Sequence, residues 1–375
     1  MIKRSMIFVS LFILWGHGPV LSQQIKDGIG KTTLPDNCVY EGEFKGGLFN
    51  GKGSMTCANG DKFTGEFKDG FIDGKGIQTS INGASYEGLF KNGYPEGQGT
   101  IKDVTGEKIE GEFKRGYPYG KGVMTGDRGE YEGNFINGLF DGEGVFIDSN
   151  GIKYQGKFKE SKLSGHAIIV TSDGDRYEGD VQNWKADGNG TFTYATGMKY
   201  EGGFKKGQFD GKGVYLDSNG NQFRGDFKNG KLNGKGVILS KEGSYEGDVK
   251  DWRANGHGEF IYPNGEKYTG EFKNNVFEGK GVFLFFNGRY EGQFKNGKYD
   301  GWGKLFLARG IKYVGQFKNG YYDGVGELTW RYGKYEGEFK RGKYNGQGVL
   351  DCANGKQLKG QFVNSRFTGK DSCFL

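Results

Sequence analysis

Cysteine is the residue type whose spacing in this 375-residue sequence most readily allows chemistry. The four cysteines, Cys38, Cys57, Cys352 and Cys373, lie near the two ends of the chain. In a secreted protein an even number of cysteines favours disulfide bonds. No Cys-x-x-Cys motif occurs, which argues against a redox role.

Other reactive groups do not form a recognisable site. The three histidines are His17, His166 and His257, and the last two each occupy a slot that often holds lysine in a recurring pattern described below. We find no Ser-His-Asp or Cys-His set, no metal-ligand spacing and no phosphate-binding loop. The sequence therefore predicts a protein that is not an enzyme, with no catalytic residues, no metal and no cofactor.

The N-terminus has the pattern of a secretory signal. Lys3 and Arg4 precede an apolar run from Met6 to Trp15, and Val20 and Ser22 suit cleavage after Ser22. The run is too short for a membrane-spanning helix, which needs roughly 20 residues. We expect a signal peptide over residues 1–22, a linker over 23–37 and the main array over 38–375. An uncleaved N-terminal helix is the alternative.

A motif like Tyr-Glu-Gly-Glu-Phe-Lys recurs along the chain every 22 or 23 residues. With its first residue as position 0, glycine stands at +2 and +11 in fifteen units, and Phe at +4 and glycine at +13 in thirteen of them. A chain with 74 glycines and only 5 prolines, in which glycine does not recur at every third residue, is neither collagen-like nor disordered. Position 0 is occupied by Tyr40, Phe63, Tyr86, Ile109, Tyr131, Tyr154, Tyr177, Tyr200, Phe223, Tyr245, Tyr268, Tyr290, Tyr313, Tyr335 and Leu358.

Each unit alternates with a period of two, which predicts two strands and a hairpin. Aromatic residues and glycines then share one face, and Glu and Lys share the other. A continuous register sets Phe44 opposite Gly51 and, across the next turn, Gly53 opposite Phe67. Glycine would thus leave room for a flat aromatic ring.

This pattern resembles the MORN (membrane occupation and recognition nexus) repeat over residues 40 to about 371. The resemblance implies an all-β fold, an elongated single-layer antiparallel sheet of about fifteen hairpins that forms a solenoid-like ribbon. It also implies a binding or scaffolding role. Members of this family serve as assembly platforms, including in cytoskeletal and ciliary structures.

The hairpin register makes two different predictions for the cysteines. Cys38 lies directly opposite Cys57 in the first hairpin, so we predict a disulfide there. Cys352 and Cys373 are separated by an intervening strand, which gives roughly 9 to 10 Å between their Cα atoms in an ideal sheet. Such a sheet excludes the bond, whereas a last unit that curls back allows it, and the sequence leaves both open.

Three further residues are candidate sites. Trp184 and Trp252 replace glycine at +7 in units where valine replaces the Phe at +4. They either compensate for the lost strand volume or form a pair of exposed interaction anchors. Asn189 begins the sequon Asn-Gly-Thr and is a candidate for glycosylation.

The predicted function is a non-catalytic scaffold in the secretory pathway or outside the cell, which binds a protein partner or self-associates. A phospholipid- or polysaccharide-binding surface is the alternative, and exposed aromatic rings would favour polysaccharide. If the signal prediction is wrong, a cytoskeletal or ciliary scaffold is expected instead. The net charge of +6 comes from basic residues dispersed among nearly as many acidic ones, which argues against nucleic acid.

Overall fold

The computed structural model describes residues 26–373 and divides the chain into two compact units. Unit 1 ends at Ala195 and unit 2 begins at Thr196. The predicted signal peptide over residues 1–22, with His17, lies outside the described residues. Within residues 26–373 the elements are β-strands, apart from one short 3-10 helix, η1 (Ala308–Gly310).

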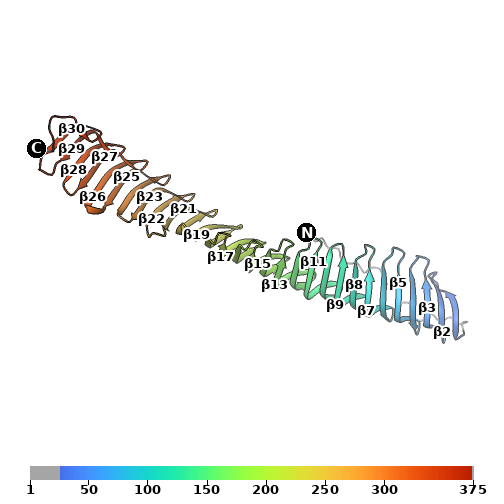
Figure 1. Ribbon diagram of the computed structural model, residues 1–375. Helices are drawn as coiled ribbons and strands as arrows, with labels where there is room; N and C mark the ends of the chain where they lie inside the picture. Colours follow the sequence, from blue (N-terminus) through green and yellow to red (C-terminus); the bar gives the residue numbers. More distant parts are fainter. Residues whose placement is uncertain (1–25, 374–375) are drawn as a thin grey trace. The chain divides into compact units, whose positions relative to one another are not determined.

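Unit 1 is a single-layer antiparallel sheet in which each strand pairs with its neighbours in sequence (Figure 1). Its strands are β1 (Gly28–Thr33), β2 (Val39–Lys45), β3 (Leu48–Thr56), β4 (Lys62–Lys68), β5 (Phe71–Thr79), β6 (Ser85–Lys91), β7 (Tyr94–Lys102), β8 (Lys108–Lys114), β9 (Tyr117–Gly126), β10 (Gly129–Ile136), β11 (Leu139–Asp148), β12 (Lys153–Lys159), β13 (Lys162–Val170), β14 (Arg176–Gln182) and β15 (Lys185–Thr193).

Unit 2 repeats this architecture. Its strands are β16 (Lys199–Lys205), β17 (Gln208–Leu216), β18 (Gln222–Lys228), β19 (Lys231–Ser240), β20 (Gly243–Lys250), β21 (Arg253–Ile261), β22 (Lys267–Lys273), β23 (Val276–Phe285), β24 (Gly288–Lys295), β25 (Lys298–Leu307), β26 (Ile311–Lys318), β27 (Tyr321–Trp330), β28 (Gly333–Lys340), β29 (Lys343–Asp351), β30 (Gln357–Val363) and β31 (Arg366–Phe367). The predicted all-β hairpin array is therefore confirmed.

The segment that we predicted as a linker contributes a strand. Residues 28–33 form β1, which pairs with β2 and sets Gly30 opposite Gly42 and Gly28 opposite Phe44. Gly28 and Gly30 thus occupy the places of the +11 and +13 glycines of a preceding repeat. The sequence does contain the Gly-x-Gly motif at residues 28–30. No position 0 to +4 motif precedes it, so we did not predict a strand there.

The register within each hairpin differs from our prediction because of a β-bulge at position +3. Gly42 faces Gly53 as expected, but Phe44 faces Phe49 and not Gly51. One residue of β2, Glu43, therefore opposes three of β3. Across the next turn Gly53 consequently faces Gly65, and Phe67 faces Gly51.

The repeat's own side chains satisfy the polar groups that this bulge leaves unpaired. The hydroxyl of Tyr40 donates to the carbonyl oxygen of Glu43 at 2.9 Å, and the N–H of Lys52 donates to Glu43 Oε1 at 2.9 Å. Gly51 has a φ of +64°, and a Cβ there would overlap the Glu43 carboxylate. The +11 glycine is therefore required by the bulge.

The same two bonds recur along the array. The position 0 hydroxyl donates to the +3 carbonyl at 2.6–3.1 Å in the ten repeats that begin with Tyr40, Tyr86, Tyr131, Tyr177, Tyr200, Tyr245, Tyr268, Tyr290, Tyr313 and Tyr335. In eight repeats the +3 side chain accepts the +12 N–H at 2.9–3.0 Å. The hydrogen bonds made at the bulge thus explain both the tyrosine at position 0 and the acid or amide at +3.

A layer of interlocked rings forms the core of the array. The Tyr290 ring is 0% exposed and stacks on Tyr299 at position +9, with ring centroids 3.7 Å apart. Phe294 of the same repeat and Phe317 of the next both meet Tyr290 edge-on at 5.1 Å. Such pairs add ~0.5–1.5 kcal/mol each beyond the burial of area. Ring contacts therefore connect each repeat to the next.

Disulfides close both ends of the array. Cys38 pairs with Cys57 across the first hairpin, with 3.9 Å between the Cα atoms. Cys352 pairs with Cys373 at a Cα separation of 5.5 Å, well below the 9 to 10 Å of an ideal sheet. The second strand of the last unit, β31, has only two residues. The chain then returns to the turn at Asn354, whose amide donates to the Cys373 carbonyl at 3.1 Å.

Candidate binding surfaces

The two tryptophans singled out from the sequence lie half-buried in the ring layer. Trp252 packs edge-on against Tyr215, Phe223 and Phe227, with centroids 5.2–5.5 Å apart. These partners belong to earlier repeats, so Trp252 makes these ring contacts outside its own repeat. The repeat that begins with Phe223 has Leu232 at +9 where others have a ring, and Trp252 supplies the missing aromatic contact.

Trp184 makes the equivalent contacts in unit 1. Its ring meets Phe146, Tyr154 and Phe158 at 5.2–5.7 Å, and the repeat it covers has Leu163 at +9. The sequence left two alternatives for each Trp, compensation for the strand volume lost in its own repeat or an exposed interaction anchor. The structure instead locates these ring contacts in preceding repeats.

Asn189 is exposed on the polar face of β15, and its main-chain N–H donates to Asp180 Oδ2 at 3.0 Å. His166 and His257 are exposed at +12 on the same kind of face. His166 Nε2 lies 3.9 Å from Glu178 Oε1. Residues 26–373 contain no group of three or more His, Cys, Asp or Glu side chains arranged to hold a metal ion.

Many acidic side chains on the polar face are engaged by the main chain. Asp248 accepts the N–H of His257 at 3.0 Å, and its ion pair with Lys235 together with this bond lowers the pKa of the Asp248 carboxyl. At position +10, Asp300 and Asp323 accept the N–H of the next turn, at Asn319 and Arg341, at 3.1 Å. These carboxylates therefore hold the backbone in place.

Trp302 is an exposed aromatic residue on the polar face that sequence analysis missed. It stands at +12, where other repeats have residues such as Lys, His or Gln, and 55% of its surface is exposed. Its N–H donates to Gln293 Oε1 at 3.0 Å, which fixes the strand beneath it. The signal was available as a Trp in a polar slot.

A shallow hollow of about 500 Å³ surrounds this residue, and we call it the Trp302 hollow. Glycines of three neighbouring strands, β23 to β25, form part of its lining. The hollow is therefore an apolar spot between charged side chains. Its side-chain lining includes Lys280, Val282, Glu291, Gln293, Lys304 and Val314.

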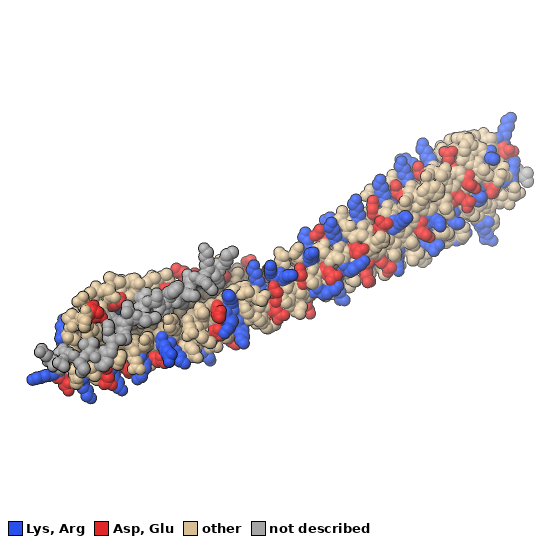
Figure 2. All heavy atoms as spheres, turned by 180° about the vertical axis from the view of Figure 1, so that it is seen from behind, with Lys and Arg blue, Asp and Glu red and all other residues tan. Residues whose placement is uncertain are grey.

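Basic residues gather at the hairpin turns of unit 2, contrary to the dispersed charge expected from the sequence. We call positions +5 to +8 of the repeats from Tyr200 to Tyr335 the unit 2 turn edge. Figure 2 shows Lys and Arg projecting at the margins of the molecular surface. The edge has one acidic residue, Asp251, and thirteen exposed basic ones: Lys205, Lys206, Lys228, Lys231, Lys250, Arg253, Lys273, Lys295, Lys298, Lys318, Lys340, Arg341 and Lys343.

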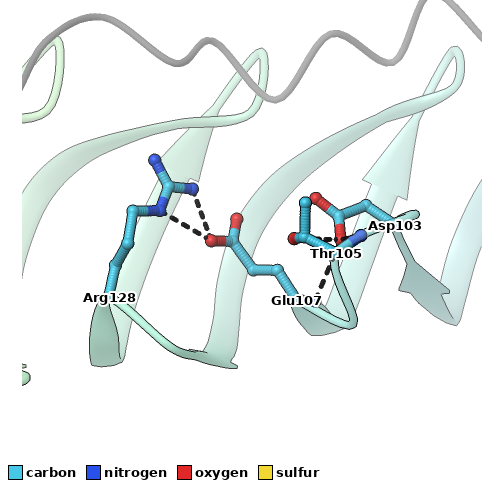
Figure 3. A network of polar contacts seen from close by, with 4 residues as sticks. All are labelled: Asp103, Thr105, Glu107 and Arg128. Atoms are coloured by element: carbon cyan, nitrogen blue, oxygen red, sulfur yellow. Dashed lines mark hydrogen bonds and ion pairs between the residues drawn. The ribbon is translucent and has the colours of Figure 1, made fainter.

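An ion pair between the buried Glu107 and the exposed side chain of Arg128 links two loops of unit 1 (Figure 3). Glu107 accepts from Arg128 Nε at 2.9 Å and from Nη2, and Glu107 Oε1 has no hydrogen-bond partner among the described residues. Asp103 Oδ1 accepts the N–H groups of Thr105 and Glu107 at 2.8 and 2.9 Å. The Asp103 turn thus positions Glu107 to connect neighbouring repeats.

The sequence signature and the hairpin geometry place the chain in a family of repeat proteins. The MORN repeat model matches fourteen consecutive segments, and the chain belongs to the MORN repeat family. The fifteenth unit, from Leu358, lies outside these matches. The matched residues are 40–62, 63–85, 86–108, 110–130, 131–153, 154–176, 177–199, 200–222, 223–244, 245–267, 268–288, 290–310, 313–333 and 335–357.

No curated protein matches this chain. Among solved structures, it is similar to the SAS-4 (dCPAP) TCP domain of Drosophila melanogaster, in complex with a proline-rich motif of Ana2, at 12% identity over 46% of this chain and 86% of that one, with a TM-score of 0.26. A streptogramin B lyase matches at 14% identity over 66% and 92%, with a TM-score of 0.13. Neither similarity is close enough to carry a functional argument.

No helix among residues 26–373 combines the length and apolar character needed to pass through a bilayer.

Proposed function

We propose that this protein is a non-catalytic scaffold of the secretory pathway or cell exterior that binds a protein partner at the Trp302 hollow. The observation that carries this proposal is the 55% exposure of Trp302, a large aromatic side chain on the face that carries the Glu and Lys side chains of the repeats. Tryptophan is strongly enriched among the residues that dominate binding energy at protein interfaces. The framework bonds of the repeat do not require a large apolar side chain at +12.

The surroundings of Trp302 suit a partner with an apolar anchor and mixed charges. Val282 and Val314 extend the apolar surface, while Lys280, Glu291 and Lys304 form a charged rim. A polar rim around an apolar centre is the usual arrangement of a protein interface. The rim would select the partner's orientation, and the centre would supply most of the affinity.

Two features support a location outside the cytosol. The N-terminus predicts cleavage after Ser22, and both ends of the described chain carry disulfides. Disulfides persist mainly in oxidising compartments. Localisation and N-terminal sequencing of the native protein test this part, because a mature start at Gln23 supports it. An intact Met1 with cytoskeletal or ciliary staining would favour the cytosolic scaffold instead.

The aromatic face offers little support for a ligand stacked on the position 0 rings. Tyr268, Tyr290, Tyr313 and Tyr335 are each 0% exposed. A row of open rings at this position would have favoured polysaccharide. These rings act as core, so the polar face and the turn edges are the surfaces available to partners.

Substitution of Trp302 tests the proposed interface. Partners crosslinked to the native protein in its own compartment would be identified and their affinity for the purified chain measured. Trp302→Lys introduces a residue common at +12 and should weaken binding at least ~10-fold, as expected for an interface hot spot. Phe286→Ser removes an aromatic residue that is 93% exposed elsewhere and should leave affinity unchanged. Equal affinities of wild type and Trp302→Lys would exclude this hollow as the interface. A self-associating chain would instead show a Trp302-dependent change in sedimentation.

A further inference from the structure

A hollow on the unit 2 turn edge brings three cations together with two amides. Lys231, Lys250 and Arg253 line it, and so do Asn255 and Asn274, in a volume of about 540 Å³. The Asn255 amide donates to Asn274 Oδ1 at 3.5 Å, which leaves the Asn274 amide nitrogen available as a donor. We call this the basic hollow. Three cations and an amide donor form a site for an anionic group.

Acidic residues that accompany the turns elsewhere are replaced by asparagine here. In later repeats Glu278, Asp300 and Asp323 stand at +10 and accept the N–H of the following turn. At the basic hollow position +10 is Asn233 or Asn255, and Asn233 Oδ1 makes the same bond to the Asp251 N–H at 3.2 Å. The backbone is held in the same way without a negative charge.

One carboxylate lies in the basic hollow. Asp251 pairs with Lys231 at 3.2 Å, and both side chains are more than half exposed. Among the described residues no ion pair involves Lys250 or Arg253. An exposed pair contributes little stability, so an arriving polyanion can displace Asp251 from Lys231 at small cost.

A second, aromatic hollow adjoins the basic one and shares Arg253 with it. This hollow has a volume of about 870 Å³, and its walls include Tyr215, Trp252 and Phe260. Ala254 at +9 stands where most unit 2 repeats carry a stacking ring, so the ring layer is thinner at this point. Ser240 and Asn275 add uncharged polar groups to the wall, and Asp217 and Glu242 add two carboxylates, so the anionic group of a ligand is directed to the Arg253 side. A bound molecule can therefore place a ring beside Trp252 and an anionic group beside Arg253.

We propose that the unit 2 turn edge binds a linear anionic polysaccharide, with a sulfate or carboxylate group in the basic hollow and a sugar ring in the aromatic hollow. Further lysines at the turns recur once per repeat, at roughly 9 to 10 Å, which suits an extended polymer with regularly spaced charges. The choice of a sugar polymer over nucleic acid rests on the extracellular part of the proposed function.

Titration of the full secreted chain with defined polymers tests this proposal. A heparin-derived hexasaccharide should bind at physiological salt, whereas uncharged dextran should not, and binding should weaken as salt rises. The double variant Lys250→Ala/Arg253→Ala should lose about tenfold or more in affinity. The matched pair Lys318→Ala/Lys340→Ala removes the same charge from the same edge and should lose less than about threefold.

Several outcomes would overturn the proposal. Equal losses in the two double variants would mean diffuse attraction with no defined site, provided that circular dichroism shows both variants folded. A single-stranded DNA of similar charge, or phosphatidylserine vesicles, binding as tightly as the hexasaccharide would exclude sugar selectivity. Trp302→Lys should retain full hexasaccharide affinity, so failure of the partner interface and failure of the sugar site are distinguishable.

Discussion

The hairpin turns of the two units share a backbone but present different chemistry. In unit 1, five of the seven +8 positions carry Leu48, Phe71, Tyr94, Tyr117 and Leu139, and two carry Lys162 and Lys185. The turns of these seven repeats contain eight basic and two acidic residues. In unit 2, four of the seven +8 positions carry Lys or Arg. Lysines of unit 1 such as Lys91 and Lys159 pair with Asp73 and Asp141 at 3.1 and 3.2 Å.

This difference shows that one set of repeat positions builds the fold and another set determines the surface chemistry. Positions 0, +2, +4, +11 and +13 build the bulge and the ring layer in both units. Positions +8 and +12 point outward and accept Leu, Tyr, Lys or Trp without changing the strand pairing. The surface chemistry of each unit can therefore change independently of its fold.

Alkaline pH should produce the largest effect and should act on both units alike. Burial raises the pKa of Tyr40 in unit 1 and of Tyr200 in unit 2 to about 12. An unfolded tyrosine ionises near pH 10, so the buried neutral rings contribute stability that is complete below pH 10 and lost as the pH rises towards 12.

Circular dichroism, with limited proteolysis to assign each unit, should show both units unfolding between about pH 10 and 12. A matched titration from pH 7 to 9 should leave both intact. Unfolding of one unit alone in that lower range would show that the two ring layers are not equivalent.

Exchange of +8 residues between the units tests whether this position sets the surface chemistry. Replacing Lys231, Arg253, Lys298 and Lys343 together by serine should reduce affinity for a sulfated hexasaccharide about 100-fold, or ~2.7 kcal/mol. Isothermal titration measures the loss. The reciprocal change of Tyr94 and Tyr117 to Lys in unit 1, tested in that quadruple variant, should restore part of the binding. Unchanged affinity of the quadruple serine variant would mean that the +8 residues do not determine hexasaccharide binding at the unit 2 turn edge.

Framework substitutions should have smaller and equal effects in the two units. A Cβ at Gly53 would lie 2.6 Å from Cε2 of Tyr40, and one at Gly281 would lie 2.6 Å from Cε2 of Tyr268. Gly53→Ala and Gly281→Ala should each cost ~1–3 kcal/mol of local stability, measured by native-state hydrogen exchange. Ser54→Ala, on the opposite face, is the control and should change it by less than about 0.5 kcal/mol. A large cost in only one unit would contradict a common framework.

Much of the fold could be predicted because its rules repeat along the chain. The period of two predicts the strands, and the register through Gly42 and Gly53 sets Cys38 opposite Cys57. The bulge escaped prediction because Glu43 looks like any polar-face residue in the sequence. Glycine occupies +11 in all fifteen units, which could have indicated a positive φ at this position. We instead explained this glycine as space for a flat aromatic ring.

The candidate sites were harder to predict because they depend on what the framework leaves free. The sequence left open whether Trp184 and Trp252 compensate for lost strand volume or act as anchors. Their ring partners lie in preceding repeats, beyond the reach of a pattern confined to one repeat. The basic edge was hidden by acidic residues of similar number, and only the structure shows that residues such as Asp300 bind main-chain N–H groups. Sorting charges by repeat position would have revealed it.

The pairing of every strand with its sequence neighbours gives each unit a defined response to mechanical load. Tension between the two ends of a unit acts along the hydrogen bonds, so strands should peel one at a time and not shear together. Each repeat of about 23 residues would release roughly 75 Å of chain. The Cys38–Cys57 and Cys352–Cys373 bonds keep the outermost hairpins from extending. The array could thus lengthen in steps while its two ends remain folded.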